Sequence, residues 1–389
     1  MVKMMKERVE NDGFLGALHA LLLMDDTVIF ATSRDMCRKK LEVLLDFCSE
    51  YGMIVNEKKT KFFVINGSEI DKYPLNVQNL TVGYCLKYLY LGAWFTDMGD
   101  MKSVLKLHEM GAAPSVHKFS VFCYVNSTMP FSYKLKVFKA ALTSSLLYSS
   151  ESWISLNVKC IEALYNRMVR ILLGVRCNTP IQLCLVEIGL NALKYEINKK
   201  RKTFLESKFS NVDLEEPFHI VLDICRRNNT PGYRFLSRSM QENNGDHSLE
   251  KIQESLRGKP NTATKFMIYR TELNPGLGAH EVYGGKVYIP DYLRQSFTRI
   301  RVMSHDLKVE TGRWSRLPRD ERVCRCNNET IQDEKHVLLD CPLLTHIRRG
   351  YNDLDYSSIG NFSSDQNYPL DLCKYVFEIT RFLKSLSNN

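Results

Sequence analysis

The sequence predicts an α+β section at its N-terminal end, then a mainly α-helical region, and last a small domain that contains cysteine and histidine. Three observations carry this prediction. Residues 21–32 show a hairpin-like pattern, apolar residues recur at helical spacing from about residue 101, and four metal-ligand side chains fall within 324–341. The chain has 389 residues, 44% hydrophobic and 25% charged, which is enough for two or three globular domains with sizeable cores.

The N-terminal section begins with two strands that meet at a pair of acids. An apolar run at 21–24 leads into Asp25 and Asp26, and a run rich in β-branched residues follows at 27–32. This pattern predicts a hairpin with a tight acidic turn. Two adjacent carboxylates suit Mg²⁺, which prefers hard oxygen ligands and takes only one or two carboxylates from a protein. On the residues alone, a solvated acidic turn is the more common explanation of such a pair.

A helix and a further strand follow the hairpin. Ser33 suits the N-cap of the helix and Gly52 its C-terminal cap. Between them, residues at helical spacing form one apolar face: Cys37, Leu41, Leu44, Leu45 and Cys48. A strand is predicted at 61–65, before the turn at Asn66 and Gly67. The opening section is therefore part of an α+β domain.

From about residue 101 the pattern is helical. Two apolar faces have helical spacing, one with Leu135, Phe138, Leu142 and Leu146, the other with Val158, Ile161, Tyr165, Met168 and Leu172, ended by Gly174. A short basic run follows at 199–202. The polar stretch 226–265 is rich in turn residues and is predicted to be a linker with at most one helix.

The net charge and the spacing of the cysteines indicate what kind of partner and location to expect. A net charge of +9 favours an anionic partner such as nucleic acid. Most of the twelve cysteines are isolated and irregularly spaced, which is typical of reduced intracellular thiols and predicts a location in the cytoplasm, the nucleus or both. The apolar stretch in residues 1–24 is broken by His19 and has no cleavage site, so it does not resemble a targeting signal. No apolar run is long enough to span a membrane, and we expect no membrane partner.

One group of cysteines differs from the others. Cys324, Cys326, His336 and Cys341 form the pattern C-x-C-x₉-H-x₄-C, and thiolates and imidazole are the ligands of structural zinc sites. We predict a closed Cys₃His site for Zn²⁺, with His346 as a possible substitute ligand. The alternative is three buried cysteines and a surface histidine.

Arginines precede this group in the sequence and are interleaved with Phe297 and Trp314. They are Arg294, Arg299, Arg301, Arg313, Arg316, Arg319 and Arg322. Such a segment can contact phosphates and stack on bases. A solvated basic face explains the pattern nearly as well.

Several motifs occur in the order that reverse transcriptases of non-LTR retrotransposons show. Residues 23–30 resemble the x-D-D hairpin, 52–61 resemble the G-L-x-x-N-x-x-K-[ST]-K signature, and 88–92 resemble the Y-L-G primer-grip turn. Residues 145–153 and 170–175 are similar to the thumb region of that family. The flanks of the cysteine group, 319–324 and 333–342, resemble the zinc-binding region that follows the polymerase.

The resemblance implies an RNA-directed DNA polymerase that uses Mg²⁺ and binds RNA and DNA as template and primer. It makes Asp25 and Asp26 the metal-site carboxylates of the palm, and Lys59 the general acid that protonates the departing pyrophosphate. An exposed cation in a lysine cluster explains Lys59 equally well. Tyr88 and Tyr90 are either core aromatics or primer-contacting groups.

Two departures from the family pattern bear on activity. Met24 stands where a small residue usually precedes the acids, and it would crowd the primer terminus. The family also carries a further aspartate on an earlier palm strand, together with the fingers. The acids upstream of the pair here, Glu7, Glu10 and Asp12, have no matching context. We expect the chain alone not to polymerise.

The resulting prediction is an α+β partial polymerase palm at residues 1–98, a mainly α-helical thumb-like region at 99–212, a linker or poorly defined connection at 213–289, and a zinc-binding domain at 290–389. The predicted function is that of a truncated non-LTR reverse transcriptase, inactive alone. The alternatives are a nucleic-acid-binding protein that retains the thumb and zinc unit, and a polymerase that another chain or further sequence completes. The oligomeric state stays open.

Overall fold

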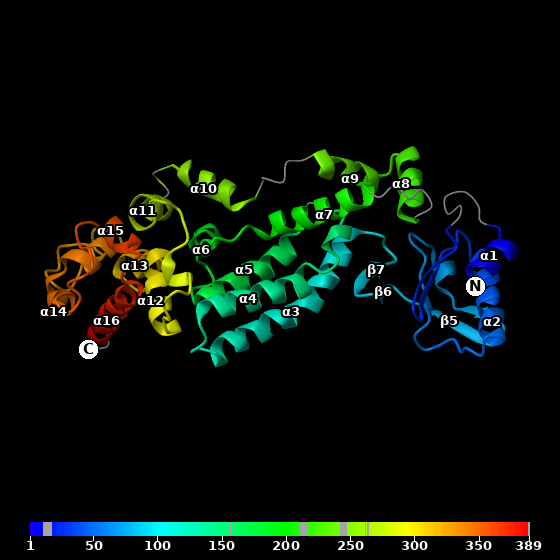
Figure 1. Cartoon of the computed structure of the whole chain (residues 1–389), viewed down its shortest axis with the longest axis horizontal. Helices are drawn as coiled ribbons and strands as arrows, with labels where there is room; N and C mark the ends of the chain where they lie inside the picture. The colour runs from blue at the N-terminus through cyan, green and yellow to red at the C-terminus, as the bar shows by residue number, and fades with distance from the viewer. Residues whose placement is uncertain are drawn as a thin grey trace. The chain divides into compact units, whose positions relative to one another are not determined.

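The computed structural model describes residues 1–10, 18–155, 157–210, 217–241, 247–260, 262 and 264–387, and Figure 1 shows the chain. It contains two compact units, and each is assembled from separate stretches of sequence. Unit 1 comprises Met1–His108, Ser149–Asn157 and Arg201–Glu242, and unit 2 comprises Glu109–Tyr148, Val158–Lys200 and Asn243–Asn389. Segments far apart in the sequence therefore share a core in both units.

The predicted hairpin and helix are present in unit 1. Strand β1 (Ala20–Leu23) pairs antiparallel with β2 (Asp26–Ile29), which leaves Met24 and Asp25 as the two-residue turn. Helix α2 (Arg34–Glu50) starts at Ser33, whose Oγ accepts a hydrogen bond at 3.1 Å from the backbone amide three residues on. Gly52 follows the helix with φ +67°, a left-handed conformation that favours glycine.

Two further small sheets complete the β-structure of unit 1. Strands β3 (Lys61–Phe62), β5 (Leu80–Tyr84) and β4 (Leu75–Val77) form a three-stranded sheet in the order β3-β5-β4, with β3 parallel to β5 and β4 antiparallel to it. Hairpin β6 (Lys87–Tyr90) and β7 (Ala93–Thr96) forms a separate sheet. The predicted strand 61–65 is therefore shorter than expected. It ends at Phe62 because the chain then turns, with the amide of Gly67 bonded to the carbonyl of Val64.

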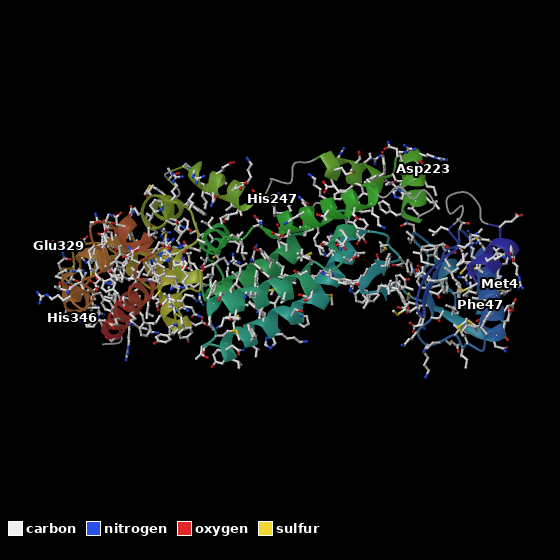
Figure 2. All side chains as sticks on the ribbon, in the orientation of Figure 1. Met4, Phe47, Asp223, His247, Glu329 and His346 are labelled. Carbon is white, nitrogen blue, oxygen red and sulfur yellow. The ribbon has the colours of Figure 1, made fainter. Side chains whose placement is uncertain are left out.

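The core of this sheet lies under α2. Alternate residues of β4 and β5 are buried against Leu41, as a half-buried strand requires: Leu75, Val77, Leu80 and Val82. Cys37, Leu44 and Leu45 of the predicted apolar face of α2 pack against the same cluster. Helix α1 (Val2–Arg8) covers another part of α2, and Met4 lies beside it there (Figure 2).

The helical region agrees with the predicted periodicity. Helices α3 (Met101–Val125) and α7 (Leu193–Ser210) contribute to both units. Unit 2 contains α4 (Phe131–Ala141), its continuation η3 (Leu142–Leu146), α5 (Lys159–Leu173) and α6 (Ile181–Ile188). The apolar residues predicted for α5 are buried, and Gly174 ends this helix with φ +69°. Short η4 (Ser150–Ser152) and η2 (Glu69–Lys72) lie in unit 1. No helix among the described residues is both long and apolar enough to cross a membrane.

The prediction of at most one helix within 226–265 is wrong. Helices α9 (Pro231–Gln241) and α10 (Leu249–Arg257) both lie there, after α8 (Pro217–Arg227). The turn residues that suggested a linker mark the ends of short amphipathic helices. Asn229, with φ +46°, separates α8 from α9, and the side chain of Ser248 caps α10. Both helices α8 and α9 belong to unit 1, whereas α10 packs on α6 in unit 2.

The C-terminal part of unit 2 is a set of short helices around α12 and α16, which pack on each other. In order they are α11 (Thr264–Ile268), η5 (Tyr269–Leu273), η6 (Glu281–Tyr283), α12 (Asp291–Arg301), α13 (Lys308–Trp314), η7 (His336–Asp340), η8 (Pro342–Leu344), α14 (Thr345–Arg348), α15 (Ile359–Ser364) and α16 (Pro369–Ser387).

A buried polar network joins this part to α6. The carboxylate of Glu187, which is fully buried, accepts hydrogen bonds from Arg301 Nε at 2.9 Å, from the Tyr269 hydroxyl at 2.7 Å and from the Tyr283 hydroxyl at 3.2 Å. Arg301 also donates to the carbonyl of Leu273 at 3.0 Å. A buried charge pair needs such complete hydrogen bonding to offset its desolvation.

The arginines that the sequence offered as nucleic-acid contacts are therefore not all available. Arg301 belongs to the network with Glu187. Arg294 is also buried, stacks on Phe131 with its guanidinium carbon 4.5 Å from the ring centre, and pairs with Asp291 at 2.9 Å. Phe297 is buried as well. These side chains face inward because α12 is packed on several sides, and the sequence pattern of α12 does not reveal that.

Candidate metal centres

The cysteine and histidine group of unit 2 converges in space. The ligand atoms of Cys324, Cys326, His336 and Cys341 all lie within 4.8 Å of one another. The Sγ atoms of Cys324 and Cys341 are 3.8 Å apart, and Cys326 Sγ lies 3.3 Å from His336 Nε2. Among the described residues, no other such group of three or more histidine, cysteine or acidic side chains occurs.

A π-helical turn brings the two later ligands together. Element η7 starts at His336, and the backbone amide of Cys341 donates to the carbonyl of His336 at 2.7 Å. This bond joins residues five apart, so a π turn places them in line, whereas an α-helix would offset them. The x₄ spacing between the histidine and the cysteine thus has a local structural cause.

A short loop presents the two earlier ligands. The amide of Cys324 donates to the carbonyl of Thr330 at 2.7 Å, and the amide of Asn328 donates back to the carbonyl of Cys324 at 2.9 Å. The side-chain oxygen of Asn327 accepts from the amides of Glu329 and Thr330, which holds the loop closed. Sequence reasoning missed Asn327, although an asparagine directly after a C-x-C pair is a turn signal.

The separations fit zinc. Tetrahedral Zn²⁺ with Zn–S bonds of about 2.3 Å places two sulfurs about 3.8 Å apart, and a sulfur and a nitrogen about 3.6 Å apart. A disulfide requires sulfurs about 2.05 Å apart, so Cys324 and Cys341 are not joined. Burial, followed by the neighbouring Cys324, raises the pKa of the Cys341 thiol to about 12, and burial lowers the pKa of His336. A soft divalent cation suits this donor set, because it stabilises the thiolates that burial alone disfavours.

Other side chains hold the ligands without belonging to the group. Gln332 Nε2 lies 3.8 Å from Cys324 Sγ, and its Oε1 accepts from the amide of Lys308 at 3.0 Å, which links the ligand loop to α13. The hydroxyl of Tyr375 donates to the carbonyl of Leu338 inside the π turn. Neither residue carried a sequence signal.

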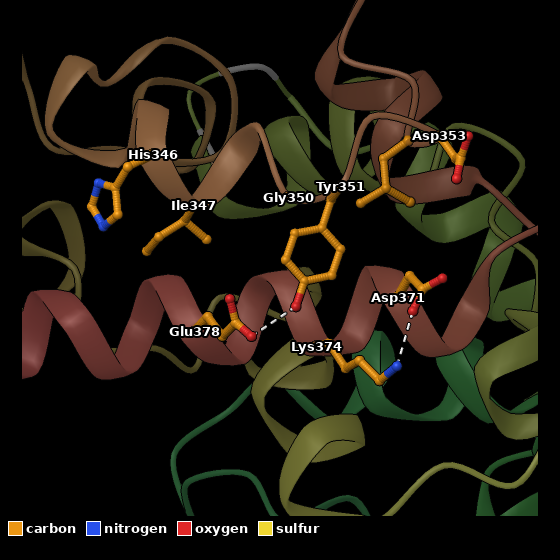
Figure 3. A pocket seen from close by; sticks show the side chains of 9 residues that line it. His346, Ile347, Gly350, Tyr351, Asp353, Asp371, Lys374 and Glu378 are labelled. Atoms are coloured by element: carbon orange, nitrogen blue, oxygen red, sulfur yellow. Dashed lines mark hydrogen bonds and ion pairs between the residues drawn. The ribbon is translucent and has the colours of Figure 1, made fainter.

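His346, the proposed substitute ligand, is not part of the group. Its ring packs on Phe382 with the centroids 5.1 Å apart, and it lines a separate pocket of about 530 Å³ (Figure 3). There the hydroxyl of Tyr351 donates to Glu378, and Lys374 pairs with Asp371, as the dashed lines in Figure 3 show.

In unit 1, Asp25 and Asp26 lie at the exposed end of the β1–β2 hairpin. Met24 precedes them with φ +54° and a side chain that is 96% exposed. Burial, and then the charge of Asp26, raises the pKa of Tyr90 on β6.

A capped turn places Lys59. The side-chain oxygen of Asn56 accepts from the amide of Lys59 at 3.2 Å, and the backbone carbonyl of Asn56 accepts from the hydroxyl of Thr60 at 2.8 Å. The carbonyl of Lys59 accepts from the hydroxyl of Tyr88 at 3.3 Å. This arrangement explains the N-x-x-K-T spacing, since the asparagine must stand three residues before the lysine to cap the turn. The Lys59 side chain itself is exposed.

The hairpin acids fit one hard cation but not two. Carboxylate oxygens are suitable Mg²⁺ ligands, and Mg²⁺ keeps several positions for phosphate and water. Two ions need a carboxylate that bridges them. Within the part of the chain that the structure describes, no third acidic, histidine or cysteine side chain converges on Asp25 and Asp26.

Comparison with known families agrees with the N-terminal motifs. Residues 1–95 match the family described as reverse transcriptase (RNA-dependent DNA polymerase). The predicted resemblance to a reverse transcriptase is thereby confirmed for this part of the chain. No curated protein and no solved structure matches the chain.

Proposed function

We propose, from the reverse transcriptase match of residues 1–95, that the chain is a partial reverse transcriptase of the non-LTR class that acts with RNA and DNA as template and primer. In this proposal residues 1–98 are part of the palm, 99–212 are thumb-like helices, and 290–389 hold structural zinc. The single observation that supports it most is the match of residues 1–95, which includes the Asp25–Asp26 hairpin. The intracellular location and the domain boundaries are part of the same proposal.

In this proposal, different residues of unit 1 bind the metal ion and donate the proton. Asp25 and Asp26 hold a hard cation at the exposed tip of the hairpin, and Lys59 donates a proton to the departing pyrophosphate. Bound Mg²⁺ supplies charge neutralisation at the phosphates and activation of the primer 3′ oxygen. The described residues offer no carboxylate to bridge a second ion. The chain alone is therefore proposed not to extend a primer.

In unit 2, Cys324, Cys326, His336 and Cys341 bind Zn²⁺ in a closed site with no place for substrate. Zinc there stabilises the fold of the loop and the π turn and takes no part in nucleotidyl transfer.

Primer extension on an RNA template tests the proposal. The purified chain with Mg²⁺ is expected to give no product, and a version completed with a reverse transcriptase fingers and palm segment that carries a further aspartate is expected to give product. The completed version with Asp26→Asn is the matched control and should lose it. Extension by the chain alone, lost in Asp26→Asn, would overturn the proposed inactivity. A completed version that gives no product, although it folds, would count against the polymerase lineage.

A second candidate is a nucleic-acid-binding protein that uses the helices and zinc unit of unit 2. The ready convergence of the four ligand atoms and the net charge of +9 favour it. Binding of RNA that weakens steeply with salt is the expected result, because released counterions drive such binding. Binding without a polymerase activity in the completed version would favour this candidate over the first.

A further inference from the structure

An exposed tryptophan of unit 2 lies among arginines that the zinc site does not use. Trp314, the last residue of α13, is 56% exposed. The guanidinium carbon of Arg176 lies 4.3 Å from the centre of its ring. Arg176 also pairs with Asp306, whose side chain is 81% exposed, and its amide donates to the hydroxyl of Ser304 at 2.9 Å. The indole is thus held in place on the surface.

A second guanidinium group stands beside the first. Arg299 is exposed, and its Nε donates to the carbonyl of Gly174 at 2.8 Å, two residues before Arg176. Partial burial lowers the pKa of Arg299, the charge of Asp306 raises it, and the charge of Arg176 lowers it by a smaller amount. Arg176 is already paired with Asp306, whereas the side chain of Arg299 is exposed and can meet a further anion such as a phosphate.

Arg316 is the third cation and stands where glycine is the preferred residue. Helix α13 ends in a Schellman motif, in which the amide of Leu317 donates to the carbonyl of Gly312 at 2.8 Å and the amide of Arg316 to that of Arg313 at 3.3 Å. Arg316 has φ +57° at the position after the cap. A side chain in this conformation strains the backbone, and glycine would not. The exposed side chain of Arg316 makes no hydrogen bond or ion pair within the described residues, so packing gives no reason for an arginine there.

We propose that Trp314, Arg299 and Arg316 form a binding surface for an unpaired nucleic-acid strand. A base stacks on the open face of the indole, whose other face carries Arg176, and the neighbouring phosphates lie against the guanidinium groups. Base stacking on an aromatic residue requires a splayed-out base and tolerates any sequence. Of the groups named in this cluster, only Asp306 is acidic, so the surface complements a polyanion. The inference rests on the proposed function, because it names where unit 2 holds template or primer.

The test measures binding of a fluorescein-labelled, unstructured RNA strand to the full-length, zinc-loaded chain by fluorescence anisotropy over a range of salt concentrations. Trp314→Ala is expected to weaken binding by about thirtyfold, the middle of the range for one stacked base. Arg316→Gly is expected to lower the slope of log affinity against log salt by about one. Its melting temperature should stay the same or rise, because glycine relieves the strained position. A purely structural arginine would not show this combination.

Matched controls locate the effect. Arg257→Gln removes an exposed arginine at the end of α10, and Trp94→Phe removes a tryptophan of unit 1, and both should bind like the wild type. Binding should quench tryptophan fluorescence in the wild type and in Trp94→Phe, but not in Trp314→Ala. A single-stranded DNA of the same length should compete, and a duplex without unpaired bases should compete poorly.

Two results would overturn this surface. One is unchanged affinity and salt slope in both Trp314→Ala and Arg316→Gly, while the wild-type chain binds RNA in a salt-dependent manner. That outcome would leave the proposed function standing. The other is a duplex that competes as well as the single strand. If Trp314→Ala and Arg316→Gly change RNA binding as expected but the completed version does not extend a primer, the polymerase proposal is rejected and the binding surface is retained.

Discussion

Replacement of Glu187 by glutamine should destabilise unit 2 more than most surface or single core changes, because the carboxylate compensates a buried arginine. Glu187 accepts from Arg301, Tyr269 and Tyr283, and also from Asn274 Nδ2 at 3.2 Å. Glutamine keeps the shape but removes the charge and turns one acceptor into a donor that faces other donors. Removing one partner of a buried ion pair costs about 3–5 kcal/mol, so we expect a loss near 3 kcal/mol for this isosteric change.

Urea unfolding followed by circular dichroism, at constant zinc, measures the loss as a lower transition midpoint with an unchanged slope. The control is Glu254→Gln on α10, whose exposed carboxylate pairs with Lys251 at the surface. Surface substitutions of that kind stay within about 0.5 kcal/mol. The double replacement Glu187→Gln with Arg301→Met should cost less than the sum of the two single changes, since it leaves no unpaired charge. A free energy of unfolding for Glu187→Gln within about 0.5 kcal/mol of the wild type would refute the reasoning.

Three further predictions concern the zinc site, a buried histidine and the hairpin. Cys341→Ser should abolish the binding of one zinc ion per chain, and it should lower the melting temperature as much as a chelator lowers that of the wild type. Cys177→Ser, at an exposed cysteine, should do neither. Elemental analysis measures the zinc content, and thermal melting measures the stability. Burial, and then the charge of Arg301, lowers the pKa of His280 from 6.5 to about 3. As the pH falls, the unfolded chain therefore binds the proton before the folded chain does. The neutral histidine contributes its full stability to the fold above pH 6.5, and this contribution is lost as the pH falls towards 3. His280→Asn should therefore flatten the fall in unfolding free energy between pH 6 and pH 4 by up to about 1.4 kcal/mol per pH unit, and an unchanged pH profile would contradict it. Met24→Gly should stabilise unit 1 by about 0.5–1 kcal/mol in urea unfolding, because Met24 has φ +54° and its exposed side chain loses no packing; destabilisation would show that the methionine makes contacts.

Local signals in the sequence were enough for the parts of the fold whose cause is local. The β-branched run after Asp26 and the cap at Ser33 predicted the hairpin and α2, because strand preference and N-capping act over a few residues. The C-x-C-x₉-H-x₄-C spacing selected the four side chains that the structure brings together. The prediction allowed at most one helix where α9 and α10 lie, because short helices of 11 and 9 residues between polar turn residues resemble a linker.

The role of each arginine depended on burial instead. Arg294, Arg301, Arg299 and Arg316 look alike in the sequence, yet the first two are buried counter-charges and the last two are exposed cations. Arg294 and Arg301 lie on the face of α12 that packs against the rest of unit 2, whereas Arg299 on α12 and Arg316 after α13 have exposed side chains. That depends on packing between segments more than a hundred residues apart, such as Arg301 with Glu187.

The sequence by itself therefore determined the local features of the chain: an acidic hairpin tip, amphipathic helices, a Cys₃His set of candidate metal ligands and a reverse transcriptase match at residues 1–95. Only the tertiary structure decided which of these groups meet. It aligned His336 with Cys341 through a π turn, and it left Trp314 on the surface under Arg176. The physical reason is that capping and periodicity act along the chain, whereas burial and charge compensation are set by neighbours that the chain brings from elsewhere.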